Sequence, residues 1–213
     1  MLDEVDDADR RLLLQSAVRR RFGRNEVVFH EGDPGDALHV VTKGIFVARS
    51  TSTLGQVIAV NVFPVGAVFG ELVLITPGAR RNATVAAMIP GETLMLGRDA
   101  FDDLRSRSPV VDRFLVRVLA ERNRNLNTHL VELLFMPVEP RIYRRLLAFA
   151  DMVSAGAGDE WIQLGQAELA TLAGTTRATV NRALRKAEQE GSVELTRGRV
   201  RIVDRGALEK QAR

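Results

Sequence analysis

The spacing of apolar residues changes its period along the chain and divides the sequence into stretches of different structure. Residues 8–21 have a helical spacing, and we expect a short helix that packs through Leu12, Leu13 and Val18. After it, short β-rich runs alternate with turns that contain glycine. Short strands separated by glycine turns predict an antiparallel barrel or sandwich. The runs are Val27–Phe29, Leu38–Val41, Ile45–Ala48, Val57–Val62, Ala83–Ala87 and Thr93–Leu96.

From Arg98 the spacing is helical, and the longest helix is predicted directly after Ser108. Serine can cap a helix, and Pro109 suits its first position. The run as far as Met136 then contains no glycine and no further proline, so nothing interrupts the helix. Six of its residues recur at alternating spacings of three and four, which is the a/d seam of a coiled coil. They are Val116, Leu119, Asn123, Leu126, Leu130 and Leu133.

A seam of this kind needs a partner helix, so we expect a parallel homodimer in which the polar Asn123 can fix the register. The alternative is a core helix that lies along the barrel. Pro137 and Pro140 are expected to end the helix and to mark a domain boundary. We therefore expect a strand-rich domain at residues 1–107, a dimerisation helix at 108–136 and a C-terminal domain at 137–213.

The C-terminal stretch contains two short helices joined by a tight turn. The first, Gln166–Gly174, ends in a glycine that can take the positive φ of such a turn. The second, Arg177–Glu190, follows a threonine pair that can cap it, and it buries Val180, Leu184 and Ala187 at helical spacing. Before this pair we expect an amphipathic helix at Arg141–Met152 and a loop at Gly156–Gly158.

Beyond Gly191, two alternating runs surround Arg197-Gly198-Arg199 and predict a hairpin, or wing, with a basic tip. The runs are Ser192–Thr196 and Val200–Val203. A helix pair with a glycine turn, a capped basic second helix and a basic wing together indicate a winged helix-turn-helix that reads double-stranded DNA. The alternative is a pair of structural helices with a solvated basic face.

The outward face of the second helix carries the residue types that DNA recognition needs. A guanidinium at Arg177 or Arg182 can bond guanine O6 and N7 together. The hydroxyls of Thr176 and Thr179 suit phosphate oxygens, which position the protein without specifying a sequence. The predicted DNA-contacting residues are Gln166, Thr176, Arg177, Ala178, Thr179, Asn181, Arg182, Lys186 and Arg199.

Charge and composition agree with this division. Residues 141–213 carry 13 Lys and Arg against 9 Asp and Glu, whereas residues 1–140 carry 17 against 18, so the positive surplus lies where DNA is expected. The chain has no cysteine, which excludes disulfides and thiolate-bound iron–sulfur clusters. The acidic start lacks the apolar region of a signal peptide, and no apolar run is long enough to span a membrane, so we expect a cytoplasmic protein.

Three motifs carry a resemblance to a known family over nearly the whole chain. They are Glu31–Gly44, Phe69–Val85 and Leu169–Arg182. With them the sequence resembles the cyclic-AMP receptor/fumarate-nitrate reduction regulator family of bacterial transcription factors. The resemblance implies an α+β fold with an N-terminal antiparallel β-roll, a long dimerisation helix and a C-terminal winged helix-turn-helix. It also implies cyclic AMP or a close relative as effector, a near-palindromic DNA site, and RNA polymerase as a further partner.

The second motif resembles a phosphate-binding cassette, and its residues suit that role. Gly70, Glu71 and Leu72 can open a short helix whose free N–H groups face a phosphate. Arg81 can supply the countercharge, and Asn82 adds an amide donor beside it. The Glu71 carboxylate suits a ribose 2′-OH. The alternative is an ion pair between Glu71 and Arg81 in a pocket that binds nothing.

The sequence departs from the family at two places. The cyclic-AMP receptor supplies hydroxyl residues from its dimer helix to adenine, but the matching stretch here reads Leu126-Asn127-Thr128, which leaves Asn127 as the predicted base contact. In the reading helix a glutamate often follows the first arginine and accepts from cytosine N4, but Ala178 stands there and cannot. We therefore expect a target that differs from the receptor's usual site at that base pair.

No motif supports an enzyme or a metal site. The chain has no nucleophile–base pair, no Walker loop and no HExxH, and its three histidines lack metal-ligand spacing. We expect a homodimeric DNA-binding regulator that a cyclic nucleotide controls. Its rivals are a ligand-independent regulator of the same fold and a nucleotide-binding regulatory subunit of an enzyme.

Overall fold

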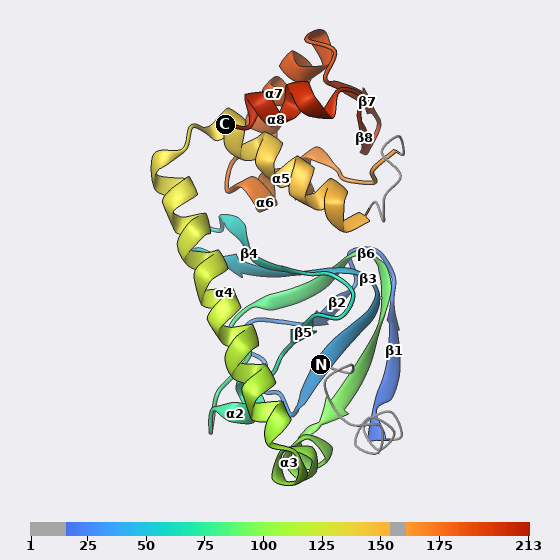
Figure 1. Ribbon diagram of the computed structural model, residues 1–213, viewed down its shortest axis with the longest axis vertical. Coiled ribbons are helices and arrows are strands. Elements are labelled where there is room, and N and C mark those ends of the chain that lie inside the picture. Colours follow the sequence, from blue (N-terminus) through green and yellow to red (C-terminus); the bar gives the residue numbers. More distant parts are fainter. Residues whose placement is uncertain (1–15, 154–160) are drawn as a thin grey trace. The chain divides into compact units, whose positions relative to one another are not determined.

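The computed structural model describes residues 16–153 and 161–213, and these form two compact units (Figure 1). The first unit contains the described residues as far as Ser50 together with Val60–Leu126. The second contains Thr51–Ala59 and the described residues from Asn127 onward. The predicted loop at Gly156–Gly158 and the first half of the helix predicted at 8–21 lie outside the described residues.

The first unit is built on an antiparallel sheet, as the sequence predicts. Strand β6 pairs antiparallel with β1, β2 and β3, while β5 pairs with β3, and the main strand order is β1-β6-β3-β4. The sheet folds around two apolar clusters, one of which is centred on Phe46 and Phe69. The strands are β1 (Val18–Phe22), β2 (Val27–Phe29), β3 (Ala37–Thr51), β4 (Val57–Phe63), β5 (Val68–Phe69) and β6 (Thr84–Gly97).

Two pairs of predicted strands are each one long strand, and glycine is the reason. The runs on either side of Gly44 form β3, and those on either side of Gly91 form β6. Gly44 has φ +79, and a Cβ there would lie 2.6 Å from the Pro90 carbonyl oxygen. A Cβ on Gly91 would lie 2.3 Å from the Lys43 oxygen, and the register of the β3–β6 pair shifts at this point. The two glycines thus let the strands bend together without ending.

The prediction of a helix through residue 21 is wrong for its second half, because Val18–Phe22 is strand β1. The segment is paired with β6 from Val18–Met95 to Phe22–Gly91. Arg19 and Arg21 lie on one face of the strand and both form ion pairs with Glu92. Tertiary pairing therefore overrides a local spacing that also fitted a helix.

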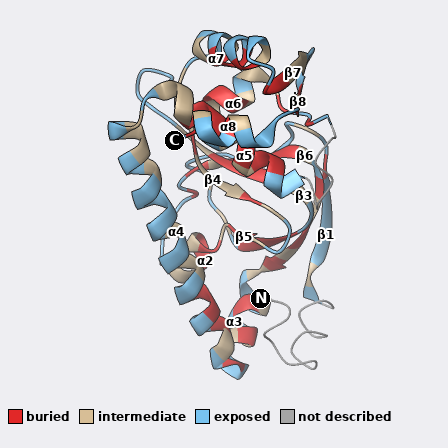
Figure 2. Ribbon diagram, turned by 45° about the horizontal axis from the view of Figure 1, so that its top comes forward, coloured by how far each residue is buried: buried red, intermediate tan, exposed pale blue. Residues whose placement is uncertain are grey.

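The described part of the first unit also contains α2 (Leu72–Ile75), α3 (Arg98–Arg107) and the beginning of α4 (Pro109–Phe135). The predicted start of α4 at Pro109 is confirmed, and its end lies one residue before the predicted end. The first turns of α4 bury Val111, Phe114 and Leu115 in an apolar cluster with α3. Most of the remaining helix is exposed (Figure 2). α4 contributes residues to both units, with the division between Leu126 and Asn127.

The second unit contains α5 (Val138–Val153), α6 (Gln166–Ala173), α7 (Arg177–Gln189), β7 (Val193–Thr196), β8 (Arg199–Ile202) and α8 (Arg205–Gln211). Its core is made by fully buried side chains of α5 such as Ile142, Tyr143 and Leu146. Pro140 does not mark a break as predicted but lies in the first turn of α5, where its missing N–H costs no hydrogen bond. None of the described helices is long and apolar enough to cross a membrane.

Candidate ligand pocket and nucleic-acid interface

A cavity of about 410 Å³ lies in the first unit, within the range that small-molecule ligands occupy. It is lined by β3, β4, the segment that leads into α2, the turn before β6, and one face of α4. The five residues predicted from the cassette motif all line this cavity. They are Gly70, Glu71, Leu72, Arg81 and Asn82.

Arg81 is held in place by its surroundings. Its guanidinium donates to the backbone oxygens of Gly70, at 2.7 Å, and Ala37, at 2.8 Å, and it lies 4.1 Å from the centre of the Phe29 ring. Burial lowers the pKa of Arg81, and the carboxylates of Asp36, Glu71 and Asp33 partly offset that effect. The buried Nε of Arg81 has no hydrogen-bond partner among the described residues. Two of the five N–H groups of the guanidinium are therefore bonded to backbone oxygens of the described chain, and three are not.

Glu71 has no exposed surface, and its two carboxylate oxygens differ. Oε1 accepts a hydrogen bond of 2.5 Å from Arg122 of α4, whereas Oε2 has no partner among the described residues. Arg122 also donates to the Val68 oxygen at 2.6 Å and lies over the Phe63 ring. Among the described residues, Glu71 thus forms its ion pair with Arg122, so the Glu71–Arg81 pair considered from the sequence is not found.

Sequence analysis missed Arg122, although a signal for it was present. Arg122 lies three residues after Leu119 and four before Leu126, so all three share one face of α4. All three line the cavity, together with Asn123. Asn127, the predicted base contact, does not line it. It is exposed and lines a separate hollow of the second unit with Thr128 and Val131.

The aromatic cluster beside the cavity contains one titratable residue, His39. Its Nδ1 lies 3.0 Å from the Thr93 hydroxyl, and its ring stacks on Phe69 with 5.0 Å between centroids. Burial, together with the charges of Arg81 and Arg20, lowers the pKa of His39 to about 3. His39 is therefore a neutral core residue at physiological pH. Across residues 16–153 and 161–213, no group of three His, Asp or Glu side chains could hold a metal ion.

The helix-turn-helix of the second unit has the predicted geometry. Gly174 ends α6 in the left-handed conformation, with φ +60. Thr176 caps α7 by accepting a hydrogen bond from the Thr179 N–H at 3.2 Å. The second helix ends at Gln189, one residue earlier than predicted, with Glu190 as its C-cap. The predicted buried positions Val180, Leu184 and Ala187 are all confirmed.

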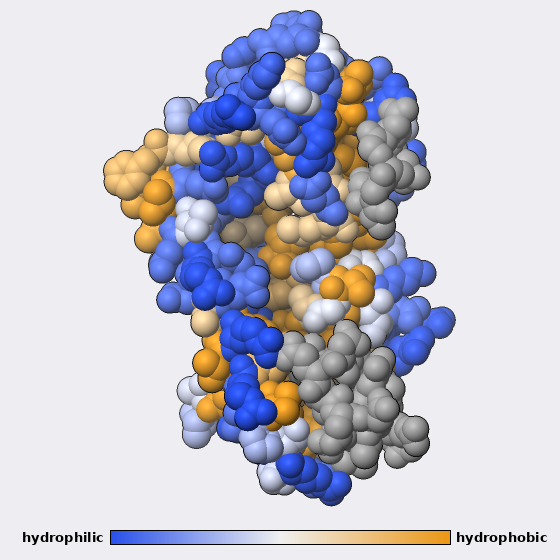
Figure 3. Space-filling view, in the orientation of Figure 1, coloured by the Kyte–Doolittle hydropathy of each residue, from blue (hydrophilic) through white to orange (hydrophobic). Residues whose placement is uncertain are grey.

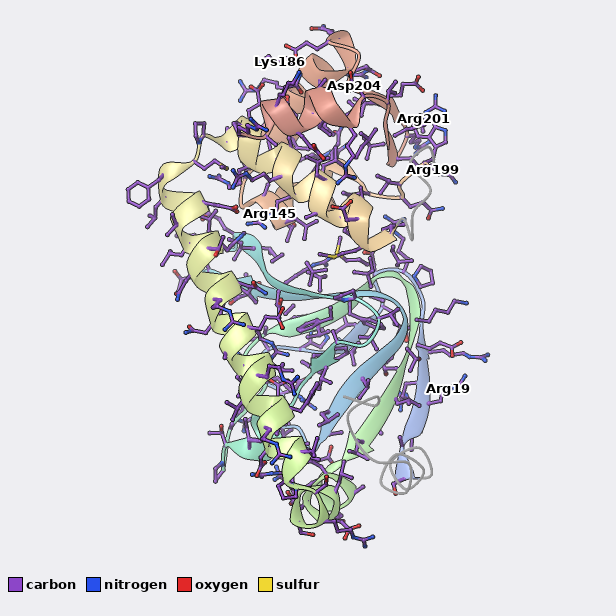
Figure 4. The ribbon with its side chains drawn as sticks, in the orientation of Figure 1. Arg19, Arg145, Lys186, Arg199, Arg201 and Asp204 are labelled. Atoms are coloured by element: carbon purple, nitrogen blue, oxygen red, sulfur yellow. The ribbon has the colours of Figure 1, made fainter. Side chains whose placement is uncertain are left out.

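Six of the nine predicted DNA-contacting residues line two hollows of the second unit. A hollow between α7 and the wing is lined by Gln166, Arg177, Asn181 and Arg199, and a second hollow adds Ala178 and Arg182. Thr176 is exposed at the start of α7, and Thr179 is half-buried one turn further on. Figure 4 shows Arg199 on β8 of the wing and Lys186 on α7.

Several of these side chains already have hydrogen-bond partners. The Asn181 amide donates to Gln166 at 3.1 Å, which fixes both side chains at the start of the helix pair. Lys186 donates to Glu139 of α5 at 2.6 Å, and this hydrogen bond raises the pKa of Lys186. Arg177 and Arg182 remain exposed on the outward face. These two arginines are therefore the best placed to meet base edges.

The predicted seam of α4 is largely accessible. Val116, Leu126 and Leu130 are exposed, at 67%, 44% and 54%, and Asn123 is exposed with them, whereas Leu119 and Leu133 are half-buried. At the end of α4, Val131, Leu134 and Phe135 are also exposed, and Figure 3 shows apolar surface gathered there. Accessible apolar side chains along one helix mark a surface that another protein surface can cover.

Comparison with known proteins bears on both regions. Residues 19–108 match the cyclic nucleotide-binding domain, and residues 140–211 match the Crp-like helix-turn-helix domain. The chain is 31% identical over 195 residues to a protein of Mycobacterium tuberculosis named CRP-like cAMP-activated global transcriptional regulator, which covers 90% of this chain and 87% of the relative. It is 33% identical over 210 residues to the cyclic AMP receptor protein of Thermus thermophilus, which covers 99% and 93%.

Among solved structures, the fold is similar to that of the global regulator CLP of Xanthomonas campestris, which is described as c-di-GMP responsive. The TM-score is 0.79 at 23% identity, and the match covers 92% of this chain and 99% of CLP.

Proposed function

The chain belongs to the Crp/Fnr family of DNA-binding transcription regulators, which are not enzymes, and on that premise we propose that a cyclic nucleotide in the β-roll cavity controls its reading of DNA. One observation carries this proposal. Two residues that line the cavity each have a buried polar atom without a hydrogen-bond partner among the described residues, Glu71 Oε2 and Arg81 Nε. Unpaired buried polar atoms are costly, so a ligand that bonds to these two side chains is favoured.

A cyclic nucleotide offers the two complementary groups. Its ribose 2′-OH can donate to Glu71 Oε2, and its phosphate oxygens can accept from Arg81. Asn82 lines the cavity beside Arg81 and adds an amide donor. We favour cyclic AMP, because both relatives described above carry this nucleotide in their names.

We further propose a homodimer paired through the α4 seam. Exposed Val116, Leu126 and Leu130 support this pairing, because each would leave water on dimerisation. The functional parts are then a strand-rich domain at residues 1–107, a dimerisation helix at 108–136 and a DNA-binding domain at 137–213. Two recognition helices related by a two-fold axis would face half-sites about 34–36 Å apart, on a near-palindromic duplex. We expect the protein to bind DNA in the cytoplasm, where the bacterial chromosome lies. RNA polymerase is the expected further partner.

Isothermal titration of the full chain tests the ligand. We expect binding of cyclic AMP, loss of that binding in Arg81→Gln, and roughly tenfold weaker binding of 2′-deoxy cyclic AMP, because a hydrogen bond to a carboxylate is lost. Equal affinity for cyclic AMP and for its 2′-deoxy analogue would show that Glu71 does not bond the ribose 2′-OH. If no cyclic nucleotide binds, the chain is a ligand-independent regulator of the same fold.

The DNA site is tested separately, by selection from a random duplex pool. The methyl of Ala178 can contact a thymine methyl, but it cannot accept from cytosine as a glutamate would. We expect a recovered site that departs from the receptor's consensus at the base pair facing Ala178, and Ala178→Glu should restore it. Recovery of the unaltered consensus by the natural chain would contradict this assignment.

A further inference from the structure

We propose that His129 makes DNA binding by this protein sensitive to acid, because a proton on its ring breaks a contact that joins the end of α4 to α5. Arg145 of α5 makes this contact, and its guanidinium donates both to His129 Nδ1 and to the Glu132 carboxylate. All three residues belong to the second unit, and Figure 4 shows Arg145 on α5. The inference goes beyond the function proposed above, because it needs no nucleotide.

The protonation state of His129 follows from its partner. A guanidinium has only N–H donors, so the Nδ1 that faces Arg145 must be an unprotonated acceptor, and the ring proton lies on Nε2. Nε2 is buried and has no hydrogen-bond partner in the part of the chain that the structure describes. A second proton would place an N–H of a charged ring against an N–H of the guanidinium. The hydrogen bond is then lost and two like charges repel each other.

The charges around the ring strengthen this repulsion. The Glu132 carboxylate on α4 bonds two guanidiniums of α5, that of Arg145 and, at 3.1 Å, that of Arg144. A third guanidinium, that of Arg141, donates to the Glu132 backbone oxygen at 3.3 Å. Positive charge therefore exceeds negative charge in this group of four residues before His129 takes up a proton.

The direction of the pH dependence follows from these neighbours. Burial and the charge of Arg145 lower the pKa of His129, with a smaller contribution from Arg141, and Glu132 partly offsets them. The segment Thr51–Ala59, which belongs to the same unit, has no charged side chain. The unfolded chain thus takes up this proton more readily than the folded unit. The contact is complete above pH 6.5, the ordinary pKa of histidine, and is lost as the pH falls below it.

α5 passes a change at this contact to the helices that read DNA. Arg141 donates at 2.8 Å to the Ala173 oxygen at the end of α6, and Tyr143 donates at 2.9 Å to the Ala183 oxygen of α7. Both donors are buried, so α5 is firmly bonded to both helices of the helix-turn-helix. When the contact with α4 is lost, α5 and the recognition helix are less ordered before they meet DNA. Ordering them on binding then costs more free energy.

The test is the affinity of the full chain for its selected duplex at pH 8 and pH 5, measured by fluorescence anisotropy at one salt concentration with and without cyclic AMP. We expect the natural chain to bind at least about fivefold more weakly at pH 5, the lower end of a typical coupling. His129→Gln keeps an acceptor for Arg145 but takes up no proton, so its affinity should change much less. His30→Gln, at an exposed histidine of the first unit, is the control and should keep the natural dependence.

A second variant and a second measurement keep the test decisive. Arg145→Gln removes the guanidinium that protonation repels, so it should bind DNA at pH 8 about as weakly as the natural chain does at pH 5. The chain's single tryptophan, Trp161, lies in the second unit, and its fluorescence follows the urea unfolding of that unit. We expect the urea midpoint to fall between pH 8 and pH 5 in the natural chain, and to fall less in His129→Gln.

The inference is wrong if the natural chain binds DNA equally well at both pH values, or if it and His129→Gln lose affinity equally. Full affinity of Arg145→Gln at pH 8, or an equal fall of the urea midpoint in the natural chain and His129→Gln, also overturns it. None of these results bears on control by a nucleotide, which the effect of cyclic AMP at pH 8 measures in the same titrations.

Discussion

Two guanidinium groups of the cavity rest on a common aromatic cluster. Arg81 lies over Phe29 at 4.1 Å and Arg122 over Phe63 at 5.3 Å. Both rings contact Phe69, with centroids 6.0 and 5.1 Å apart. Cation–π contacts of this kind stabilise a charge away from water. The cluster therefore positions both arginines before a ligand arrives, which reduces the ordering cost of binding.

The position of Arg81 also depends on a glycine that touches it. A Cβ on Gly35 would lie 2.4 Å from Arg81 Nε, so Gly35→Ala must displace the guanidinium from its two backbone acceptors. We expect cyclic nucleotide affinity to fall at least tenfold although no charge is removed. Isothermal titration measures this loss.

Gly23→Ala is the matched control in the same unit, because its Cβ would meet only the Glu26 carboxylate at 3.5 Å, an ordinary contact. Undiminished affinity in Gly35→Ala would show that the guanidinium contacts are not needed for binding.

His39 gives the first unit a pH-dependent stability. Its pKa is about 3 in the folded chain against 6.5 for an ordinary histidine, so the unfolded chain binds a proton that the folded chain does not. The stabilising effect is complete above pH 6.5 and is lost as the pH falls from 6.5 towards 3. Between pH 7.5 and pH 5 the loss is about 2 kcal/mol.

Urea unfolding at these two pH values tests the effect. We expect His39→Gln to unfold with a smaller pH dependence than the natural protein, whereas His30→Gln, at an exposed site, keeps the natural dependence. An identical pH dependence in His39→Gln and the natural chain would show that His39 is not buried in its neutral form.

At the scale of elements, the sequence predicted best what local pattern determines. The start of α4, the left-handed Gly174, the Thr176 cap and the wing all follow from residues close together in the chain. β1 could not be recognised, because its partner β6 lies far along the chain and its arginines fit a helix equally well. The continuity of β3 likewise depends on Gly44 meeting the backbone of another strand.

The same distinction holds within the cavity. Glu71 and Arg81 were predicted because both belong to one short motif, and the fold brings them to one cavity. Arg122 and Gly35 act through contacts with residues remote in sequence, so no local pattern reveals these contacts. The sequence shows that Arg122 shares a helix face with Leu119, but it does not show that Arg122 bonds the Glu71 carboxylate.

The exposed seam of α4 leads to a prediction about association. Leu130 is 54% exposed, and a leucine that is buried on dimerisation contributes roughly 1.5–3 kcal/mol. Because each dimer contains two copies, Leu130→Lys should weaken dimerisation about a hundredfold or more. Sedimentation velocity over a concentration series measures the change.

Glu121→Lys introduces the same side chain at an exposed position of α4 outside the seam, and it should leave the dimer intact. If both variants dimerise as the natural chain does, the seam is not the interface.

At the scale of the whole molecule, ligand and DNA act on different units of one chain. The cavity belongs to the first unit and the helix-turn-helix to the second, while α4 runs continuously through both. A ligand can shift an equilibrium of such a molecule only by as much as its affinity differs between the two states. Couplings of this kind are typically worth about 1–3 kcal/mol.

The most direct test is the affinity of the full chain for its selected duplex, measured by fluorescence anisotropy at one salt concentration with and without saturating cyclic AMP. We expect the nucleotide to tighten DNA binding roughly 5- to 150-fold, and Arg81→Gln to remove that increase while keeping the affinity found without nucleotide. If the natural chain binds cyclic AMP and its DNA affinity does not change, the cavity does not control the DNA-reading unit.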